Sequence, residues 1–207
     1  EQEICFIERG DKRSLLVQRL KAQGDGELAI VFSRTKHGSD KLARHLNTAG
    51  IKAEAIHGNR SQAQRDRTLN RFRKGILPVL VATDVAARGV DVKDVTLVVN
   101  FDIPNEPEAY VHRIGRTGRA GAMGNAVSFC SPEEREFLRD IEKLIQQTIP
   151  VSDDHAWHLP ALAERHASPR GVNGKGGVTQ KPSRGNRRPR SRHRYRGRSG
   201  SRRPAKA

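Results

Sequence analysis

Short apolar runs alternate with longer segments of mixed polarity along residues 1–150. Each run has almost no polar interruption, as in Leu28-Ala29-Ile30-Val31-Phe32. Runs of this kind are typical of strands that are buried on both faces of a sheet. We therefore predict strands at 3–7, 28–32, 52–56, 78–82, 95–99 and 125–129.

The segments between these runs carry helix signals. Ser61 and Gln64 form a capping box, and the helix that follows should turn Leu69, Phe72 and Ala63 inward. Asp11 is a candidate cap for an earlier helix. Helices are predicted at 11–20, 36–49, 61–74, 106–114 and 132–147.

Strands that alternate with helices predict an α/β fold, in which helices cover both faces of a parallel sheet. Ligands of such sheets collect at the carboxyl ends of the strands. Four predicted strands end in polar residues, which parallel geometry would gather at one edge of the sheet. These clusters are Ser33-Arg34-Thr35, His57-Gly58, Thr83-Asp84, and Asn100 with Asp102. A functional edge explains all four, but helix capping explains Ser33, Thr35 and Asp84 equally well.

The positive charge of the chain is concentrated at its carboxyl end. Of the 39 Lys and Arg residues, 15 lie in 165–207, and no Asp or Glu follows Glu164. Residues 1–164 therefore carry 24 basic and 23 acidic side chains. We predict a folded domain at 1–150, a linker at 151–166 that packs Trp157 onto it, and a disordered Arg/Gly/Ser/Pro-rich tail at 167–207. A nucleic-acid surface on the domain must then be a local patch.

Cys5 and Cys130 lie in predicted buried strands, which favours reduced thiols and a cytoplasmic location over a disulfide. No apolar run approaches the ~20 residues that a membrane span needs, and no signal peptide opens the chain. The only methionine is Met123, so we expect a segment to precede residue 1.

The stretch with the strongest chemical signal runs from Tyr110 to Gly121. Arg113, Arg116 and Arg119 recur in it at a spacing of three, with glycines between them. Arginine presents a permanently charged, planar fork to phosphate oxygens, and glycine lets a ligand approach the backbone. A solvated basic turn is the alternative, but the spacing and the glycines favour phosphate contact.

A second motif runs from Val81 to Val92. In it a buried strand leads into a turn where Gly89 leaves room and Asp91 presents a carboxylate. A carboxylate in this position can accept hydrogen bonds from a ribose. The alternative is an ion pair between Arg88 and Asp91, which is of little energetic value if exposed. The arginine run favours the nucleotide interpretation.

These two stretches closely resemble the fifth and sixth conserved motifs of the DEAD-box RNA helicases. Phe32-Ser33-Arg34-Thr35 resembles the fourth motif, and the segment from His57 to Arg65 resembles the one that follows it. The resemblance covers residues 1–150 in the same order and is closest to bacterial RhlE-like members. It implies the second of two RecA-like domains, with ATP bound in the cleft between the two.

The resemblance also implies roles for single residues. Arg116 and Arg119 would be arginine fingers that reach the γ-phosphate of ATP, and His112 would couple them to the partner domain. Gly89 and Asp91 would belong to the ATP site, with Asp91 on the ribose. Contacts to the RNA sugar–phosphate backbone, which do not read sequence, would come from Thr35, Gly58, Gln62, Arg65 and Thr83. From the residues alone, a packed histidine at 112 and a solvated helix face at Arg65 are the alternatives.

Two signatures of ATP hydrolysis are absent from the sequence. It holds no G-x-x-x-x-G-K-[ST], and no Asp-Glu-Ala-Asp. In the family these elements belong to the first domain, which also holds Mg²⁺. We therefore predict no metal site in this chain and no ATP hydrolysis by this chain alone.

The predicted tail is densest in arginine over 184–203, where Arg192, Arg194 and Arg196 surround Tyr195. Arginines with an aromatic ring can bind RNA by phosphate contact and stacking, without reading its sequence. A solubilising low-complexity tail is the alternative.

The sequence thus predicts the C-terminal half of an ATP-dependent RNA helicase that couples ATP hydrolysis to local RNA unwinding. Its partners would be RNA, the first RecA-like domain and ribosomal or RNA-degradation complexes, with no membrane. One alternative is a related superfamily 2 helicase that acts on DNA. The other is a non-enzymatic RNA-binding or annealing module that acts through the tail.

Overall fold

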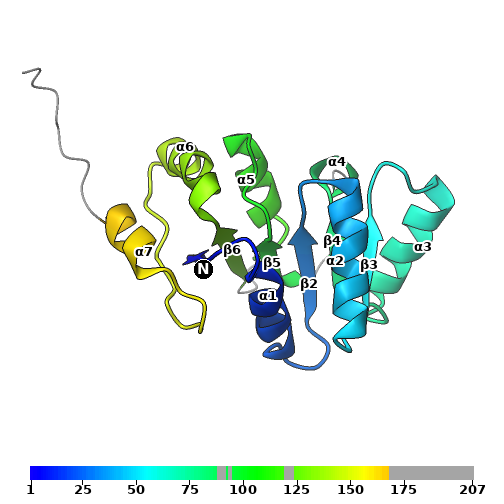
Figure 1. The fold of residues 1–207 in the computed structure, drawn as a ribbon. Coiled ribbons are helices and arrows are strands. Elements are labelled where there is room, and N and C mark those ends of the chain that lie inside the picture. Colours follow the sequence, from blue (N-terminus) through cyan, green and yellow to red (C-terminus); the bar gives the residue numbers. More distant parts are fainter. Residues whose placement is uncertain (88–91, 93–94, 119–123, 168–207) are drawn as a thin grey trace, which may run out of the picture. The chain divides into compact units, whose positions relative to one another are not determined.

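A parallel sheet of six strands forms the centre of the computed structural model (Figure 1). The structure describes residues 1–87, 92, 95–118 and 124–167. The strands lie in the order β1-β6-β5-β2-β4-β3, and every neighbouring pair is parallel. The predicted α/β architecture is therefore confirmed.

All six predicted strands are present, and no bound differs from the prediction by more than one residue. They are β1 (Gln2–Phe6), β2 (Leu28–Phe32), β3 (Ala53–Ile56), β4 (Val79–Ala82), β5 (Val95–Asn100) and β6 (Asn125–Cys130). Every residue of β2 is buried, as expected for a central strand with helices on both faces.

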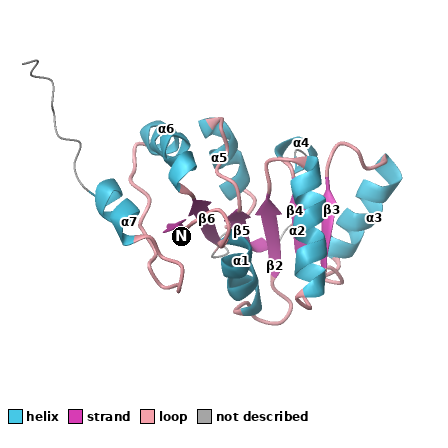
Figure 2. Ribbon diagram, viewed as in Figure 1, coloured by secondary structure: helices cyan, strands magenta, loops and turns pink. Residues whose placement is uncertain are grey.

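The helices cover both faces of this sheet (Figure 2). They are α1 (Lys12–Lys21), α2 (Lys36–Thr48), α3 (Gln62–Arg73), α4 (Asp84–Ala87), α5 (Pro107–Ile114), α6 (Arg135–Ile145) and α7 (Pro160–Ala167). The predicted helix at 132–147 begins as a short 3-10 turn, Pro132–Glu134, and continues as α6. The short α4 and the terminal α7 were not predicted. No helix in the described part of the chain combines the length and apolar character that a membrane crossing requires.

The helix ends match the sequence signals in part. Ser61 and Gln64 form the predicted capping box at the start of α3. Asp11 precedes α1, but its side chain makes no capping hydrogen bond, so that prediction was wrong. Ala63 was also predicted wrongly, because it is exposed. Phe72 is buried, as expected.

Two layers of apolar side chains, one on each face of the sheet, form the core. Val31 and Val81 belong to the layer under α1 and α2. Ile30 and Leu80 belong to the opposite layer, under α3 and α4, and α5 and α6 continue that face over β1 and β6. Fully burying side chains of this size stabilises the fold by about 1.5–3 kcal/mol each.

Lys12 is buried at the start of α1 and ties three segments together. Its ammonium group donates to the carbonyl oxygens of Phe101 and Phe129, each at 2.9 Å, and pairs with Glu134. Glu134 also accepts from Arg34 Nη2 at 3.1 Å. These partners compensate the cost of burying both charges.

Residues 150–152 run along the outer edge of β1. Ile4 N donates to Pro150 O, and Ser152 N donates to Ile4 O, both at 2.8 Å. The backbone N–H and C=O of Ile4, at the middle of this edge of the sheet, are therefore paired within the chain.

The segment 151–166, which we predicted as a linker, lies in the same compact unit as the sheet. Trp157 packs against the core, as predicted. Leu162 of α7 packs against the layer that includes Phe6, and the rings of Phe6 and His166 meet edge-on at 5.2 Å between centroids. The folded unit therefore extends beyond the predicted boundary at residue 150.

Cys5 and Cys130 are free and buried, so we expect both thiols to be unreactive in the folded chain. Burial raises the pKa of the Cys5 thiol to about 11 and the pKa of the Cys130 thiol to about 12, so little thiolate forms near neutral pH. Titration with a chromogenic disulfide reagent at pH 8 should find no rapidly reacting thiol in the native chain and two in denaturant. Fast reaction of either thiol without denaturant would contradict this burial.

Candidate functional site

The carboxyl ends of β2, β4 and β3 lie side by side. Phe32 is paired with Ala82, and Ala82 with Ile56. The ladder continues past the strand ends, because Thr83 N donates to Ile56 O at 3.3 Å. On the other side of β2, Asn100 at the end of β5 is paired with Phe32. All four predicted polar clusters therefore lie on one edge of the sheet.

The loop after β2 is held by Asp102. Its carboxylate accepts from Arg34 N at 2.8 Å and from Ser33 Oγ at 3.3 Å. Thr35 then caps α2, because its hydroxyl oxygen accepts from Gly38 N at 3.0 Å. A hydroxyl that accepts one hydrogen bond can still donate its own hydrogen to a ligand, so capping and ligand binding are compatible at Thr35.

The loop after β3 lies next to this one. Gly58 faces open space, since a Cβ on it would meet only the Cε atom of Lys36, at 4.0 Å. Lys36 Nζ donates to Asn59 Oδ1 at 2.7 Å and so bridges the two loops. Our sequence analysis missed Lys36, whose only signal is its position directly after Thr35. Thr83 is buried at the end of the strand between these loops.

Gln62 and Arg65 lie together in the first turn of α3. Arg65 Nη1 donates to Gln62 Oε1 at 3.2 Å, and Gln62 Nε2 donates to Asp66 Oδ1 at 2.9 Å. Gln62 is exposed and Arg65 is half-buried, so Arg65 is not simply part of a solvated face.

Arg113, the first arginine of the run, is buried and ion-paired. Only 2% of its side chain is exposed. Nε and Nη2 donate to the two carboxylate oxygens of Asp84, at 2.6 and 2.8 Å. Nη1 donates to Asn100 Oδ1 at 3.0 Å and to Asp102 O at 2.8 Å. The guanidinium carbon also lies 5.0 Å from the centroid of the Phe32 ring.

These contacts correct two expectations. The run does not present three equivalent arginines to a phosphate, because the fork of Arg113 is already filled by protein groups. Asp84, considered as a cap or a ligand, is instead the bidentate partner of Arg113. Arg113 thus fixes α5 against the ends of β2, β4 and β5.

His112 and Arg116 lie together at the end of α5. His112 is exposed and Arg116 is half-buried, and Arg116 Nε donates to His112 O at 3.3 Å. Both line a cavity of about 310 Å³ that Phe32, Asp84 and Ala109 also line. The cavity therefore combines an imidazole and a guanidinium beside the carboxyl edge of the sheet.

The backbone after α5 requires glycine at two places. Gly118 has a φ of +67°, a conformation that favours glycine. A Cβ on Gly124 would collide with Thr117 Oγ1 and the backbone nitrogen of Gly118. The turn of the arginine run is therefore packed closely against the start of β6.

Seven of the predicted site residues lie outside the part that the structure describes. These residues are Gly89, Asp91, Arg119, Arg192, Arg194, Tyr195 and Arg196. Their roles stay predictions.

Comparison with known proteins identifies the family. The model of the helicase conserved C-terminal domain matches residues 11–121. The DEAD-box ATP-dependent RNA helicase CshA of Bacillus subtilis is 58% identical over 143 residues, which are 69% of this chain and 29% of that protein. DEAD-box ATP-dependent RNA helicase 46 of Arabidopsis thaliana is 54% identical over 145 residues, which are 70% of this chain and 22% of that protein.

Solved structures agree with these relatives. The E. coli DEAD-box protein SrmB, bound to the regulator of ribonuclease activity A, has a TM-score of 0.68 and 37% identity, over 73% of this chain and 89% of that one. Domain 2 of the DEAD-box helicase Mss116p, bound to an RNA duplex, has a TM-score of 0.65 and 27% identity, over 75% and 64% of the two chains.

The chain spans between 22% and 32% of the length of the curated relatives that it matches. The predicted similarity to RhlE-like members in particular stays a prediction. The chain belongs to the helicase conserved C-terminal domain family and has the RecA-like fold of the C-terminal domain of DEAD-box RNA helicases.

Proposed function

We propose that this chain is the second RecA-like half of a cytoplasmic, ATP-dependent RNA helicase. It acts with a first RecA-like domain, which holds Mg²⁺ and the remaining contacts to ATP. The names of the relatives and the short span of this chain within them support this proposal. The observation that carries it is the position of His112 and Arg116, which the buried Arg113 holds beside the carboxyl edge of the sheet.

The nucleotide half of the proposal rests on the chemistry of this cavity. A guanidinium group at its wall suits a polyphosphate, because it offers charge-assisted hydrogen bonds to phosphate oxygens. Arg116 and Arg119 bind the γ-phosphate, and Gly89 and Asp91 receive the ribose. When bound, ATP supplies the phosphoanhydride bond that is cleaved. His112 couples the fingers to the first domain.

The RNA half of the proposal rests on the adjoining strand ends. Thr35, Gly58 and Thr83 follow three neighbouring strands, and Gln62 and Arg65 open the next helix. Together they hold one RNA strand by its sugar–phosphate backbone. Closure of the two domains on ATP then bends that strand and separates a short duplex locally. The tail, through Arg192, Arg194, Tyr195 and Arg196, adds affinity for RNA without reading its sequence, and ribosomal or RNA-degradation complexes are the proposed setting.

ATP hydrolysis by this chain joined to its first RecA-like domain tests the proposal. We expect RNA to stimulate hydrolysis by the joined protein and the chain of residues 1–207 alone to be inactive. A malachite-green phosphate assay, with and without single-stranded RNA or DNA of equal length, measures both.

Each alternative predicts a different outcome of this assay. Stronger stimulation by DNA than by RNA would indicate a DNA helicase. Loss of all RNA-dependent activity on deletion of 165–207, with hydrolysis indifferent to Arg116, would indicate an annealing module that acts through its tail.

A further inference from the structure

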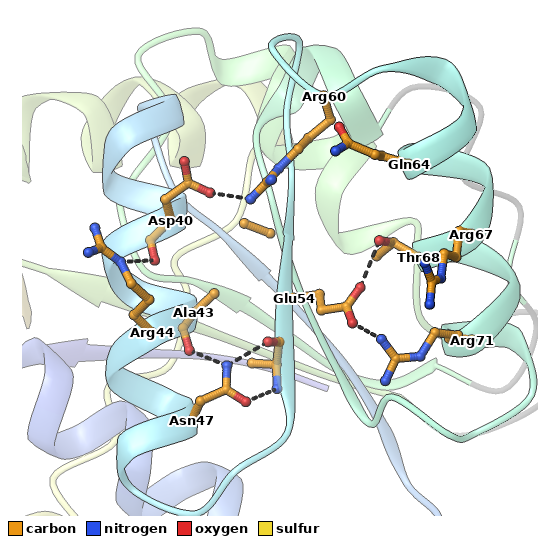
Figure 3. Close-up of a pocket in the computed structure, with 12 residues that line it drawn as sticks. Asp40, Ala43, Arg44, Asn47, Glu54, Arg60, Gln64, Arg67, Thr68 and Arg71 are labelled. Atoms are coloured by element: carbon orange, nitrogen blue, oxygen red, sulfur yellow. Dashed lines mark hydrogen bonds and ion pairs between the residues drawn. The ribbon is translucent and has the colours of Figure 1, made fainter.

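The two edges of the sheet differ. The outer edge of β1 is paired with residues 150–152, as described above. The other edge is β3, which pairs only with β4. No other described strand lies beyond β3, so its outer backbone groups face a groove between α2 and α3 (Figure 3). We call this the edge groove.

A side chain already imitates a neighbouring strand at one end of the edge groove. Asn47 Nδ2 donates to Ala53 O at 2.7 Å, and Asn47 Oδ1 accepts from Ala53 N at 3.3 Å. A strand in an added ladder would make the same two bonds. Backbone groups alternate in direction along a strand, so Ala55 points its N–H and C=O the same way as Ala53. In the described part of the chain, no side chain or loop hydrogen-bonds Ala55 at this edge.

The edge groove is large enough for an extended peptide and has two unlike walls. Its volume is about 560 Å³. Along the wall toward α2, Ala43 forms a small apolar strip with Ala53 and Ala55 of the strand, and Asp40, Arg44 and Asn47 of the helix flank this strip. The wall toward α3 is formed by Arg67 and Arg71, which project from that helix beside β3 (Figure 3). The side toward α2 thus has a small apolar strip at its centre, and the side toward α3 is basic.

The positive charge of the groove exceeds what its own carboxylates compensate. Glu54 pairs with Arg71 and accepts from Thr68 Oγ1 at 2.8 Å. Asp40 accepts from Arg60 at 2.9 Å and lies 3.0 Å from His57 Nε2. Two further arginines, Arg44 and Arg67, line the groove, and no described carboxylate pairs with either. The groove therefore carries two uncompensated guanidinium groups.

These features favour a protein ligand over RNA. The N–H and C=O of Ala55 at this edge match the alternating donors and acceptors of a peptide backbone, which a sugar–phosphate backbone does not offer. The α3 residues that line the groove, Gln64, Arg67, Thr68 and Arg71, form one stripe along that helix. Successive residues of an α-helix are rotated by about 100°, so the proposed RNA contacts Arg65 and Gln62 lie about 110° and 170° around the helix from the middle of this stripe. These two residues therefore point away from the groove. A second copy of β3 is disfavoured as the ligand, because it would bring two basic grooves together.

We propose that the edge groove binds an extended acidic segment of a partner protein, which adds as a strand to β3. Side chains of an added strand alternate between the two walls. The segment therefore carries Asp or Glu at every second position, facing Arg67, and small apolar residues between them, facing Ala43 and Ala55.

The test uses the chain of residues 1–207 and a synthetic seven-residue peptide of alternating Glu and Val, labelled with a fluorophore. Fluorescence anisotropy should show saturable binding that Arg67→Glu weakens about tenfold, since an attractive pair becomes a repulsive one. Arg13→Glu, at an exposed arginine of α1 outside the groove, should bind the peptide as the wild type does. A peptide with methylated backbone nitrogens should lose binding, because it cannot complete the ladder.

Several results would overturn the proposal. The first is a methylated peptide that binds as tightly as the unmethylated one. The second is an equal loss of peptide affinity in Arg67→Glu and Arg13→Glu. The third is no measurable binding of the unmethylated peptide to the wild-type chain. Displacement of the peptide by a single-stranded oligouridylate would show that the groove is part of the RNA path instead. We expect instead that the Arg67→Glu variant binds this oligonucleotide with nearly the same affinity as the wild-type chain.

Discussion

Replacing Arg116 by alanine should lower RNA-stimulated ATP hydrolysis by about 10³-fold or more in the protein completed by its first RecA-like domain. Charge spreads over the transferred phosphoryl group in the transition state, and a fixed guanidinium stabilises it there more than in the ground state. Arg116 lies at the wall of the cavity beside the strand ends, where such a group would act.

Steady-state kinetics at saturating RNA measure this effect. The loss should appear in kcat, with RNA affinity near that of the wild type, because Arg116 is not among the proposed RNA contacts. Arg139→Ala, at an arginine of α6 that is also half-buried and lies outside the cavity, is the matched control and should leave kcat unchanged. Unchanged kcat in Arg116→Ala would remove Arg116 from the proposed catalytic group.

Replacing Arg113 by alanine should instead destabilise the fold, by about 1–3 kcal/mol in the free energy of unfolding, because a buried acceptor loses its donor while the half-exposed Asp84 can be solvated. The substitution removes the donor to the buried Oδ1 atom of Asn100, the ion pair with Asp84 and the stacking on Phe32. Urea denaturation of the 1–207 chain, followed by far-UV circular dichroism, measures the change. Arg113→Lys should fall between wild type and alanine, since it keeps the charge but not the fork.

Arg116→Ala serves as the internal control for this measurement. Arg113 is buried and Arg116 is half-buried at the cavity, so the two substitutions should separate stability from catalysis. A free energy of unfolding that falls equally in both variants would mean that the network of Arg113 contributes no more to stability than the half-buried Arg116 does.

The sheet could be predicted from the sequence because its strands are uninterrupted apolar runs. A central strand with helices on both faces excludes polar residues almost completely, so the pattern of β2 is unambiguous. The position of the polar clusters could be predicted as well, because the carboxyl ends of parallel strands all lie at the same edge of the sheet. Capping and ligand binding could not be separated at Thr35, because a hydroxyl that accepts from Gly38 N can still donate its hydrogen to a ligand.

The different roles of Arg113 and Arg116 could not be predicted from their regular spacing. The distinction depends on Asp84, which is 29 residues away along the chain and approaches only when β4 and β5 flank β2. One local signal existed. Tyr110, Arg113 and Ile114 are spaced as the inner face of a helix, and Gly115 ends that helix before Arg116.

Helix α7 was missed because its apolar residues are few. Leu159, Leu162 and Ala163 have the spacing of one helical face, and Pro160 suits a first helical turn. One short apolar face of this kind is a weaker signal for a helix than the repeated apolar spacing of a full amphipathic helix. Its packing against β1 and α6 is long-range and could not be read from the local sequence.

The pairing of β1 with β6 means that β1 can join the sheet only late in the synthesis of the domain. β1 precedes the other strands of its sheet in the sequence, yet its partner strand begins at Asn125, and the backbone that covers its other edge lies at 150–152. At typical elongation rates, roughly 6–25 s pass on the ribosome between the two strands. Through that interval the strand Gln2–Phe6 lacks both of its neighbours in this sheet, so among the strands of the sheet β1 would give chaperones that shield exposed strands their longest opportunity.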